Sequence, residues 1–216
     1  MITLSRFRAP LLGLLTLGLL ATSCKKDNDD PEPTVKGLKT EAHDDNRMMD
    51  IMHENMLLMD AVPMTMDPDN DFALMMRVHH QGAIDMANEE KSRGDNAEMK
   101  AIAGRVIVAQ TAEIAEMTSF LAAHNAHRHV MAFDTAARLA MERMDRAQDT
   151  RPLTGDTDQD FAQLMTDHHQ SAIEMAQAEL KYGHEAQMLA MAQKMIEDQL
   201  LEIAELQEWL KVNKGF

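Results

Sequence analysis

The sequence predicts an all-α protein, a four-helix bundle built from two duplicated helical hairpins with two additional helices. Residues 71–121 align without a gap with residues 160–210, at a constant offset of 89 (160 − 71). A fixed offset of this kind indicates an internal duplication. Within each copy, Ala, Met, Glu, Gln and Leu dominate, and apolar residues recur every three or four positions. This pattern favours helices over strands.

Residues 1–24 are typical of a bacterial lipoprotein signal peptide. Arg6 and Arg8 supply the positive start, residues 11–20 form an apolar run, and small residues precede Cys24, the only cysteine. We expect cleavage and acylation at Cys24, which would anchor the protein by lipid in the bacterial cell envelope, at the outer membrane or the periplasmic face. The alternative is a secreted protein whose cysteine merely neighbours the cleavage site.

The segment after the signal peptide is expected to be a flexible tether. Residues 25–43 are charged, contain proline and have few apolar side chains, so the duplicated helical domain would cover residues 44–216. Removing Arg6 and Arg8 changes the formal net charge from −15 to −17 (−15 − 2). This acidic balance argues against a nucleic acid partner and favours cations near the surface.

The first copy is expected to contain a helix over about residues 72–93 and a second helix that ends near residue 123. Gly94 would end the earlier helix in a left-handed conformation, and Asp95 or Asn96 would cap the next one.

The second copy repeats this pattern, with a helix from about residue 160 to a stop at Gly183 and another that ends near residue 211. Two further helices, over about residues 44–61 and 128–148, would precede the copies. They share a weak sequence similarity, which suggests an ancestral unit of three helices.

A histidine pair flanked by methionines occurs once in each copy. The stretch MRVHHQGAIDMA begins at Met76, and MTDHHQSAIEMA begins at Met165. Helical spacing places the first histidine of each pair on the apolar stripe that faces inward. The chain contains 21 methionines and few aromatic residues, so soft thioether sulfur is abundant.

Two interpretations of this repeated set compete. Each histidine could bond to a polar group on a neighbouring helix while the methionines fill space. Alternatively, imidazole and thioether together are suitable donors for Cu(I) or another soft ion. The unchanged repetition favours metal binding, and the candidate ligands are His79, His80, Met76, Met86, His168, His169, Met165 and Met175.

Carboxylate di-iron bundles place Glu-x-x-His pairs on facing helices to bind iron. This chain contains no Glu-x-x-His, and methionine stands at the equivalent spacing in each copy. Exchanging carboxylate for thioether favours soft copper or silver over hard iron.

The second helix of each copy places an amide and a carboxylate within its apolar face. We expect these side chains to orient the ligating imidazoles, and the candidates are Gln110, Glu113, Gln199 and Glu202. The alternative is that the two glutamates reach solvent from the edge of the face.

Two other groups could bind metal, although core packing is the slightly favoured interpretation of the first and solvated histidines are the favoured interpretation of the second. In the helix before the first copy, an auxiliary soft-metal site could consist of Met49, Met52, His53 and Met56. In the later connecting segment, Cu(II) or Zn(II) could be captured by His124, His127 and His129 beside Met131.

The doubled HHQ-x-A-I-[DE]-M-A helix and its partner helix resemble the ferritin-like bundle family of domains of unknown function number 305, over about residues 44–212. Similar sequences include copper-binding envelope proteins associated with metal tolerance, so the resemblance implies copper binding. By position, the family motif falls on His79, His80 and Met86, and on His168, His169 and Met175. Family members often carry an acidic residue or proline before the histidine pair. Asp167 matches this family preference, whereas Val78 at the equivalent position does not. This difference puts equal metal affinity of the two copies in doubt.

These observations predict an envelope metal-binding protein that binds Cu(I), or also Cu(II) or Ag(I), for copper buffering, delivery or tolerance. A copper-handling protein would be a partner. One alternative is a ferritin-like, metal-dependent oxidoreductase, although no arrangement of catalytic residues supports an enzyme. Another is a metal-free interaction module whose methionine-rich surface holds a partner helix.

Overall fold

The computed structural model describes residues 40–213 and confirms the all-α fold class. Within this range the helices are α1 (Arg47–Asp60), α2 (Pro68–Arg93), α3 (Ala97–Ala123), α4 (Met131–Asp149), α5 (Thr157–Tyr182) and α6 (Ala186–Val212). The described residues form no strand apart from one isolated bridge between Glu41 and Leu153. The expected signal peptide, Cys24 and most of the tether lie outside the described residues.

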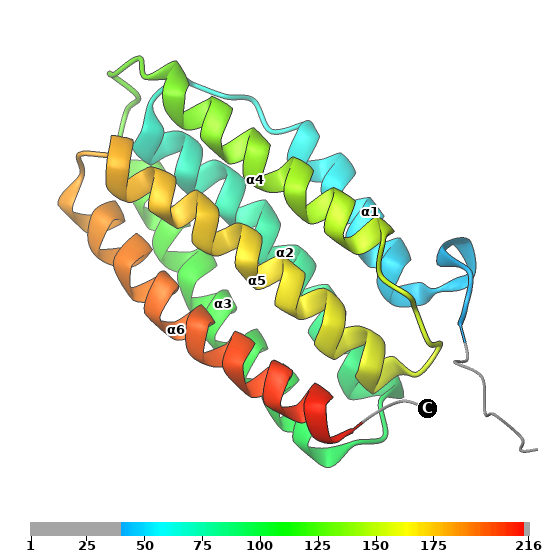
Figure 1. Cartoon of the computed structure of the whole chain (residues 1–216). Coiled ribbons are helices and arrows are strands. Elements are labelled where there is room, and N and C mark those ends of the chain that lie inside the picture. The colour runs from blue at the N-terminus through cyan, green and yellow to red at the C-terminus, as the bar shows by residue number, and fades with distance from the viewer. Residues whose placement is uncertain (1–39, 214–216) are drawn as a thin grey trace, which may run out of the picture. The chain divides into compact units, whose positions relative to one another are not determined.

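Helices α2 and α5 form the centre of the bundle (Figure 1). They contact each other, α3 packs on α2, and α6 packs on α5. Helices α1 and α4 cover the opposite side of the central pair, α1 on α2 and α4 on α5. Each copy therefore has the same three-helix arrangement. Because α2 and α5 are covered on two sides, their histidine-bearing stretches are removed from solvent.

The interior is filled mainly by methionine and alanine. Phe72, Phe133 and Phe161 are fully buried, and Phe120 and Trp209 are nearly so. Buried alanines such as Ala83 and Ala172 occupy little volume on α2 and α5, so these helices can approach closely. Methionine then fills the irregular gaps, since its unbranched side chain adapts to the space available.

The glycines that end α2 and α5 are not left-handed, so that expectation is wrong. Gly94 has φ −59° and Gly183 has φ −68°. The structure requires glycine there because a Cβ atom would collide with a buried carboxyl group, that of Glu90 at Gly94 and that of Glu179 at Gly183. The reason for glycine is lack of space rather than backbone conformation.

Helix α3 is long and apolar enough, by length and composition alone, to cross a membrane. It packs along α2 in this structure. A helix of a bundle core can have the same composition, so this feature is weak support for a membrane span.

Candidate metal centre

The first histidines of the two pairs meet where α2 and α5 cross. The ring centroids of His79 and His168 are 3.7 Å apart, with the ring planes inclined by 40°. Both side chains are fully buried, as are those of His80 and His169. The duplicated histidines therefore form one cluster at the centre of the bundle.

Burial lowers the pKa of His79 and of His168 well below the usual value, and the charges of neighbouring histidines lower it further. Both imidazoles are therefore neutral at physiological pH. A neutral imidazole has an unprotonated ring nitrogen, which is the form that binds a metal ion.

The second histidine of each pair is oriented by a carboxylate from the partner helix. Nε2 of His80 lies 2.7 Å from Oε2 of Glu113, on α3. Nε2 of His169 lies 2.8 Å from Oε2 of Glu202, on α6, although its N–H is not aligned for a hydrogen bond. A carboxylate accepts a hydrogen bond from Nε2–H, and in this tautomer Nδ1 keeps a free lone pair.

His79 is oriented in the same sense by Ser171. The Ser171 hydroxyl can donate to the carbonyl of His168 at 2.7 Å, and its oxygen lies 2.7 Å from Nε2 of His79. When the hydroxyl donates to the carbonyl, it accepts from Nε2–H, and Nδ1 of His79 keeps its lone pair. The sulfur of Met144 lies 3.1 Å from the same hydroxyl oxygen, so a thioether is adjacent to the histidine pair.

Several ring nitrogens in this cluster have no hydrogen-bond partner. Nδ1 is unpartnered and buried in His79, His80, His168 and His169, and His168 and His169 also lack a hydrogen-bond partner at Nε2. A buried polar atom without a partner costs about 1–3 kcal/mol. A metal ion bound to these lone pairs would remove that cost, and this is the observation that fits a metal best.

The predicted methionines are all fully buried, but helix geometry divides them into two groups. Met76 and Met165 precede the crossing histidines by three residues, about 4.5 Å along the helix axis. Met86 and Met175 follow the same histidines by seven residues, which is about 10 Å. An ion at the crossing point is therefore within closer reach of Met76 and Met165.

The four histidines do not form a metal site by themselves. Among the described residues, two groups of three or more His, Cys, Asp or Glu side chains have donor atoms within 4.8 Å of one another, and neither group includes these four. A site at the crossing would therefore combine a pair of imidazoles with thioether sulfur, which is a donor set for Cu(I).

Gln110 and Gln199 are buried on α3 and α6, and the Oε1 atom of each has no hydrogen-bond partner. The described contacts do not connect them to a histidine, so their role in orienting the ligands stays a prediction.

The two copies differ around the crossing point. Helices α1 and α4 end at Asp60 and Asp149, at the same offset of 89, so positions 55 and 144 are equivalent, as are positions 82 and 171. The second copy therefore has Met144 and Ser171 at these positions, whereas the first copy has Asn55 packed against Gly82. The side-chain amide of Asn55 donates a hydrogen bond to the carbonyl of Val78 at 2.8 Å.

Asp167 also distinguishes the copies, because its carboxylate pairs with Arg151 through two contacts of 2.6 Å. Val78 stands at the equivalent position and cannot form such a pair. The acidic residue before the second histidine pair therefore contacts an arginine, and the unequal surroundings of the two pairs have a structural basis.

The residues considered for an auxiliary site on α1 separate in the structure. Met49 and Met52 are buried in the core, whereas the exposed His53 lies 3.3 Å from Asp149. Met56, the fourth residue of that group, lines a cavity of about 270 Å³ between α1, α2 and α4 together with other methionines that were not part of the predicted group. The methionines of the cavity are Met56, Met59, Met64, Met75 and Met141.

Residues 69–210 match the model of a family described as a domain of unknown function (DUF305). The chain belongs to this family. The DUF305 domain thus includes both histidine pairs and both partner helices. No curated protein matches the chain at a significant level.

Two solved structures are similar to this DUF305 protein. One, described as CopM in the Ag-bound form by co-crystallization, is 27% identical with a TM-score of 0.52, and the match covers 68% of this chain and 98% of that chain. The other, CopM in the Cu(I)-bound form, is 28% identical with a TM-score of 0.49 and coverages of 66% and 95%. The first likeness extends over nearly the whole of the solved chain and supports the helical-bundle fold.

Proposed function

We propose that this DUF305 protein binds Cu(I) at the α2–α5 crossing, in the cell envelope, for copper buffering, delivery or tolerance. The ligands are His79 and His168 with the thioethers of Met76 and Met165. The observation that carries the proposal is the buried imidazole pair, whose Nδ1 atoms are unpartnered. The similar CopM is described in an Ag-bound form, and Ag(I) is a soft ion like Cu(I).

Three features support Cu(I) in preference to a hard ion at this place. The low pKa of both imidazoles keeps them available as neutral ligands. The contacts of Glu113 and Glu202 in the described residues are with His80 and His169, and not with the two histidines at the crossing. Thioether sulfur from methionine selects Cu(I) over Mg(II), Ca(II) or Fe(II). The same donors would accept Ag(I), whereas Cu(II) prefers nitrogen and oxygen.

The proposal is tested by a quadruple variant, His79→Gln, His168→Gln, Met76→Leu and Met165→Leu. Met→Leu nearly conserves volume, so it removes sulfur with little effect on packing. Cu(I) affinity is measured under reducing conditions by competition with a chromophoric chelator. We expect the quadruple variant to bind at least about tenfold more weakly, a change of about 1.4 kcal/mol or more.

A matched control carries the same kinds of substitution elsewhere: His53→Gln, His129→Gln, Met99→Leu and Met188→Leu. Both control histidines are exposed, and both control methionines are buried at the starts of α3 and α6, far along the bundle from the crossing. The control should bind Cu(I) like the wild type. Equal uptake by the quadruple variant would show that the ligands are wrong, and no uptake by the wild type would refute copper binding itself.

A further inference from the structure

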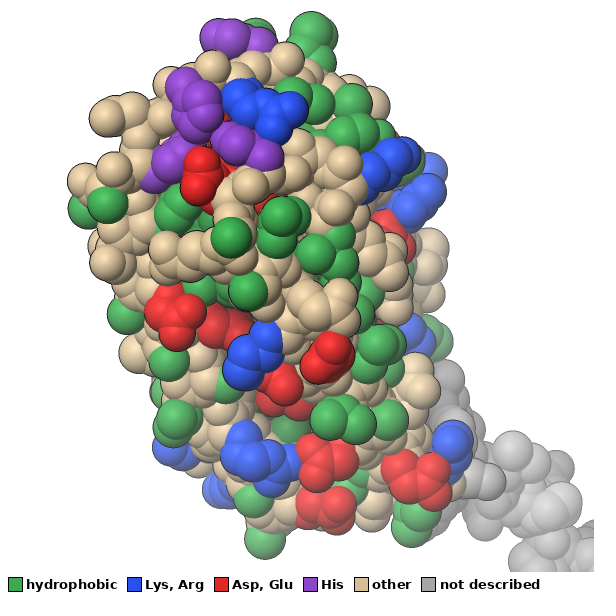
Figure 2. All heavy atoms as spheres, turned by 90° about the vertical axis from the view of Figure 1, so that its left-hand side faces the viewer, with side chains coloured by type: hydrophobic (Ala, Val, Ile, Leu, Met, Phe, Trp, Pro, Cys, Tyr) green, Lys and Arg blue, Asp and Glu red, His purple; other side chains and the backbone are tan. Residues whose placement is uncertain are grey.

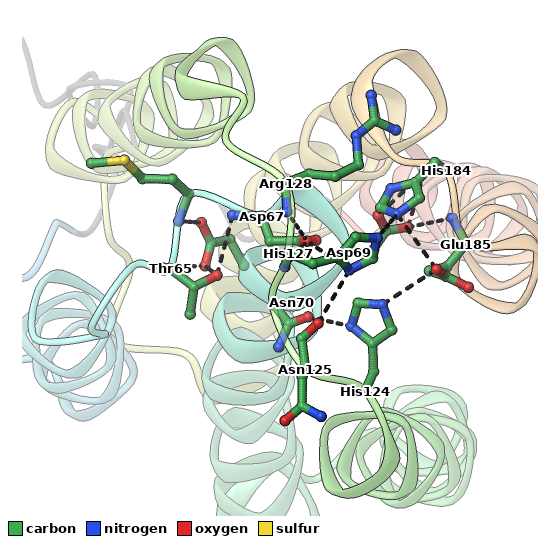
Figure 3. Close-up of polar contacts among 12 residues, drawn as sticks. Thr65, Asp67, Asp69, Asn70, His124, Asn125, His127, Arg128, His184 and Glu185 are labelled. Carbon is green, nitrogen blue, oxygen red and sulfur yellow. Dashed lines mark hydrogen bonds and ion pairs between the residues drawn. The ribbon is translucent and has the colours of Figure 1, made fainter.

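One end of the bundle gathers histidines from two segments that are distant in the sequence. His124 and His127 follow α3, whereas His184 and Glu185 lie in the turn between α5 and α6. Figure 2 shows histidine and acidic side chains together at one end of the face that it views. Figure 3 shows the side chains of His124, His127, His184 and Glu185 pointing toward one another. We refer to these four residues as the end cluster.

The donor atoms of the end cluster are spaced like the ligands of one metal ion. Nε2 of His127 lies 3.2 Å from Nε2 of His184. Oε1 of Glu185 lies 3.3 Å from Nε2 of His124 and 3.4 Å from Nε2 of His184. Two nitrogen atoms bound to tetrahedral Zn(II) at about 2.0–2.1 Å are about 3.3 Å apart. These separations therefore already match the edges of a tetrahedral site.

Acceptors on the other side of each ring hold the imidazoles in this orientation. Nδ1 of His124 lies 2.5 Å from Oδ1 of Asn70. Nδ1 of His184 lies 2.5 Å from Oδ2 of Asp69, although without the alignment of a hydrogen bond. Nδ1 of His127 lies 3.2 Å from the carbonyl of Asn125. Metal-binding histidines usually have their second nitrogen occupied by such an acceptor, which fixes the tautomer.

This tautomer places unprotonated nitrogens close together. With the protons on Nδ1, the Nε2 atoms of His127 and His184 present lone pairs to each other across 3.2 Å. Two lone pairs at that distance repel, and a cation between them would be bound by both. The Glu185 carboxylate and the fully buried Asp67 and Asp69 add negative charge around the same point.

The duplication provides an internal comparison for this end of the bundle. Asp95 and Asn96 occupy the positions equivalent to His184 and Glu185. At both ends, the backbone N–H groups of these turn residues donate to a buried aspartate, Asp158 at 3.1 and 3.0 Å in one copy and Asp69 in the other. The turn folds without imidazole, so the histidines are not needed to form it.

We propose that the end cluster is a second metal site, which takes a divalent ion, Cu(II) or Zn(II). Three imidazoles and one carboxylate, without thioether, form a donor set for these borderline ions rather than for Cu(I). The side chains are 15% exposed for His124, 55% for His127, 23% for His184 and 36% for Glu185, so the site is open to solvent. This inference does not depend on the proposed Cu(I) function.

The test uses the full chain without reductant, titrated separately with Zn(II) and with Cu(II). We expect one equivalent of either ion to bind, and bound Cu(II) to show nitrogen coordination in its electron paramagnetic resonance spectrum. In the variant His124→Gln/His184→Gln, affinity should fall by more than about 100-fold, because even loss of an outer hydrogen-bond partner costs about 10–100-fold. Circular dichroism checks that the variant is folded.

The control His53→Gln/His129→Gln removes two exposed histidines, one of them from the same segment as His127. It should bind Zn(II) and Cu(II) like the wild type. Unchanged affinity in the His124→Gln/His184→Gln variant, or loss of binding in the control, would overturn the assignment. The quadruple variant of the α2–α5 crossing should keep this site, so failure of the Cu(I) proposal would be distinguishable from failure of this one.

Discussion

The hydrogen-bond partner of each imidazole decides which ring nitrogen is available to a metal. Glu113 occupies Nε2 of His80 and Ser171 occupies Nε2 of His79, so Nδ1 is free in both. In the end cluster the arrangement is reversed, because Asn70 and Asp69 face Nδ1, and Nε2 faces the other members of the cluster. The same side chain therefore presents different nitrogens at the two candidate sites.

Removing the carboxylates that orient the second histidines should weaken Cu(I) binding. In the variant Glu113→Gln/Glu202→Gln, the amide can donate as well as accept, so it no longer fixes the imidazole tautomer. We expect Cu(I) affinity to fall by about 10–100-fold, the usual effect of losing such a partner. Chelator competition measures the change.

The exposed glutamates Glu116 and Glu205 on the same helices provide the control for that variant. Glu116→Gln/Glu205→Gln should leave Cu(I) affinity unchanged. An equal loss in both double variants would mean that the effect comes from net charge rather than from orientation of His80 and His169.

At the scale of helices, a carboxyl group of α2 lies against a carboxyl group of α5 at each end of this helix pair. Glu90 near the end of α2 lies against Asp158 at the start of α5, and Glu179 near the end of α5 lies against Asp69 at the start of α2. Burial, helped by the neighbouring aspartate, raises the pKa of Glu90 to about 8 and that of Glu179 to about 9. Both glutamates are therefore protonated at neutral pH and can donate to the aspartates.

This arrangement predicts a stability that falls as the pH rises. Because the folded-state pKa lies above the ordinary 4.5, the stabilisation is complete below pH 4.5 and is lost as pH passes about 8 to 9. In the wild type, we expect the free energy of unfolding to decrease by on the order of 1–3 kcal/mol as these groups lose their protons. Most of this decrease should be absent in the variant Glu90→Gln/Glu179→Gln. Urea denaturation at pH 6 and pH 9.5 measures it.

The exposed substitution Glu116→Gln is the control for the pH experiment and should retain the decline seen in the wild type. If the Glu90→Gln/Glu179→Gln variant declined as steeply as the wild type, then these two carboxyl groups would not be the ones that titrate.

At the scale of the whole molecule, the duplication creates one shared centre and two separate ends. The α2–α5 crossing contains residues of both copies, so a ligand there is held by both. Each end instead joins the start of one copy to the turn of the other, and only one end carries the end cluster. The two candidate sites thus lie at different depths and offer different donor atoms.

The proposed envelope location makes a prediction for the whole chain. Acylation of Cys24 would place the bundle at a membrane surface on the proposed tether. In bacteria, the wild type should incorporate labelled fatty acid and fractionate with membranes, whereas Cys24→Ser should remain unlabelled. An unlabelled, freely soluble wild type would contradict the lipid anchor while leaving the metal proposals unaffected.

The sequence by itself determined the helices, the duplication and the inward position of the first histidine of each pair, because each follows from local periodicity and from the constant offset between the copies. It also predicted Glu113 and Glu202 as partners of the imidazoles, since both lie on the apolar face of their helices. It could not identify Met144, whose equivalent in the other copy is Asn55.

Only the tertiary structure decided which metal-donor atoms lie close together. The sequence grouped His124 and His127 with His129, whereas the end cluster joins the first two to His184 and Glu185, which are 57 or more positions away. No local pattern encodes such a separation. The role of Gly94 likewise depends on the Glu90 carboxyl group packed against it, and not on the backbone angle that its sequence position suggested. Side-chain convergence arises from the packing of α2 against α5 and of the turns at the bundle end, which helical periodicity alone does not specify.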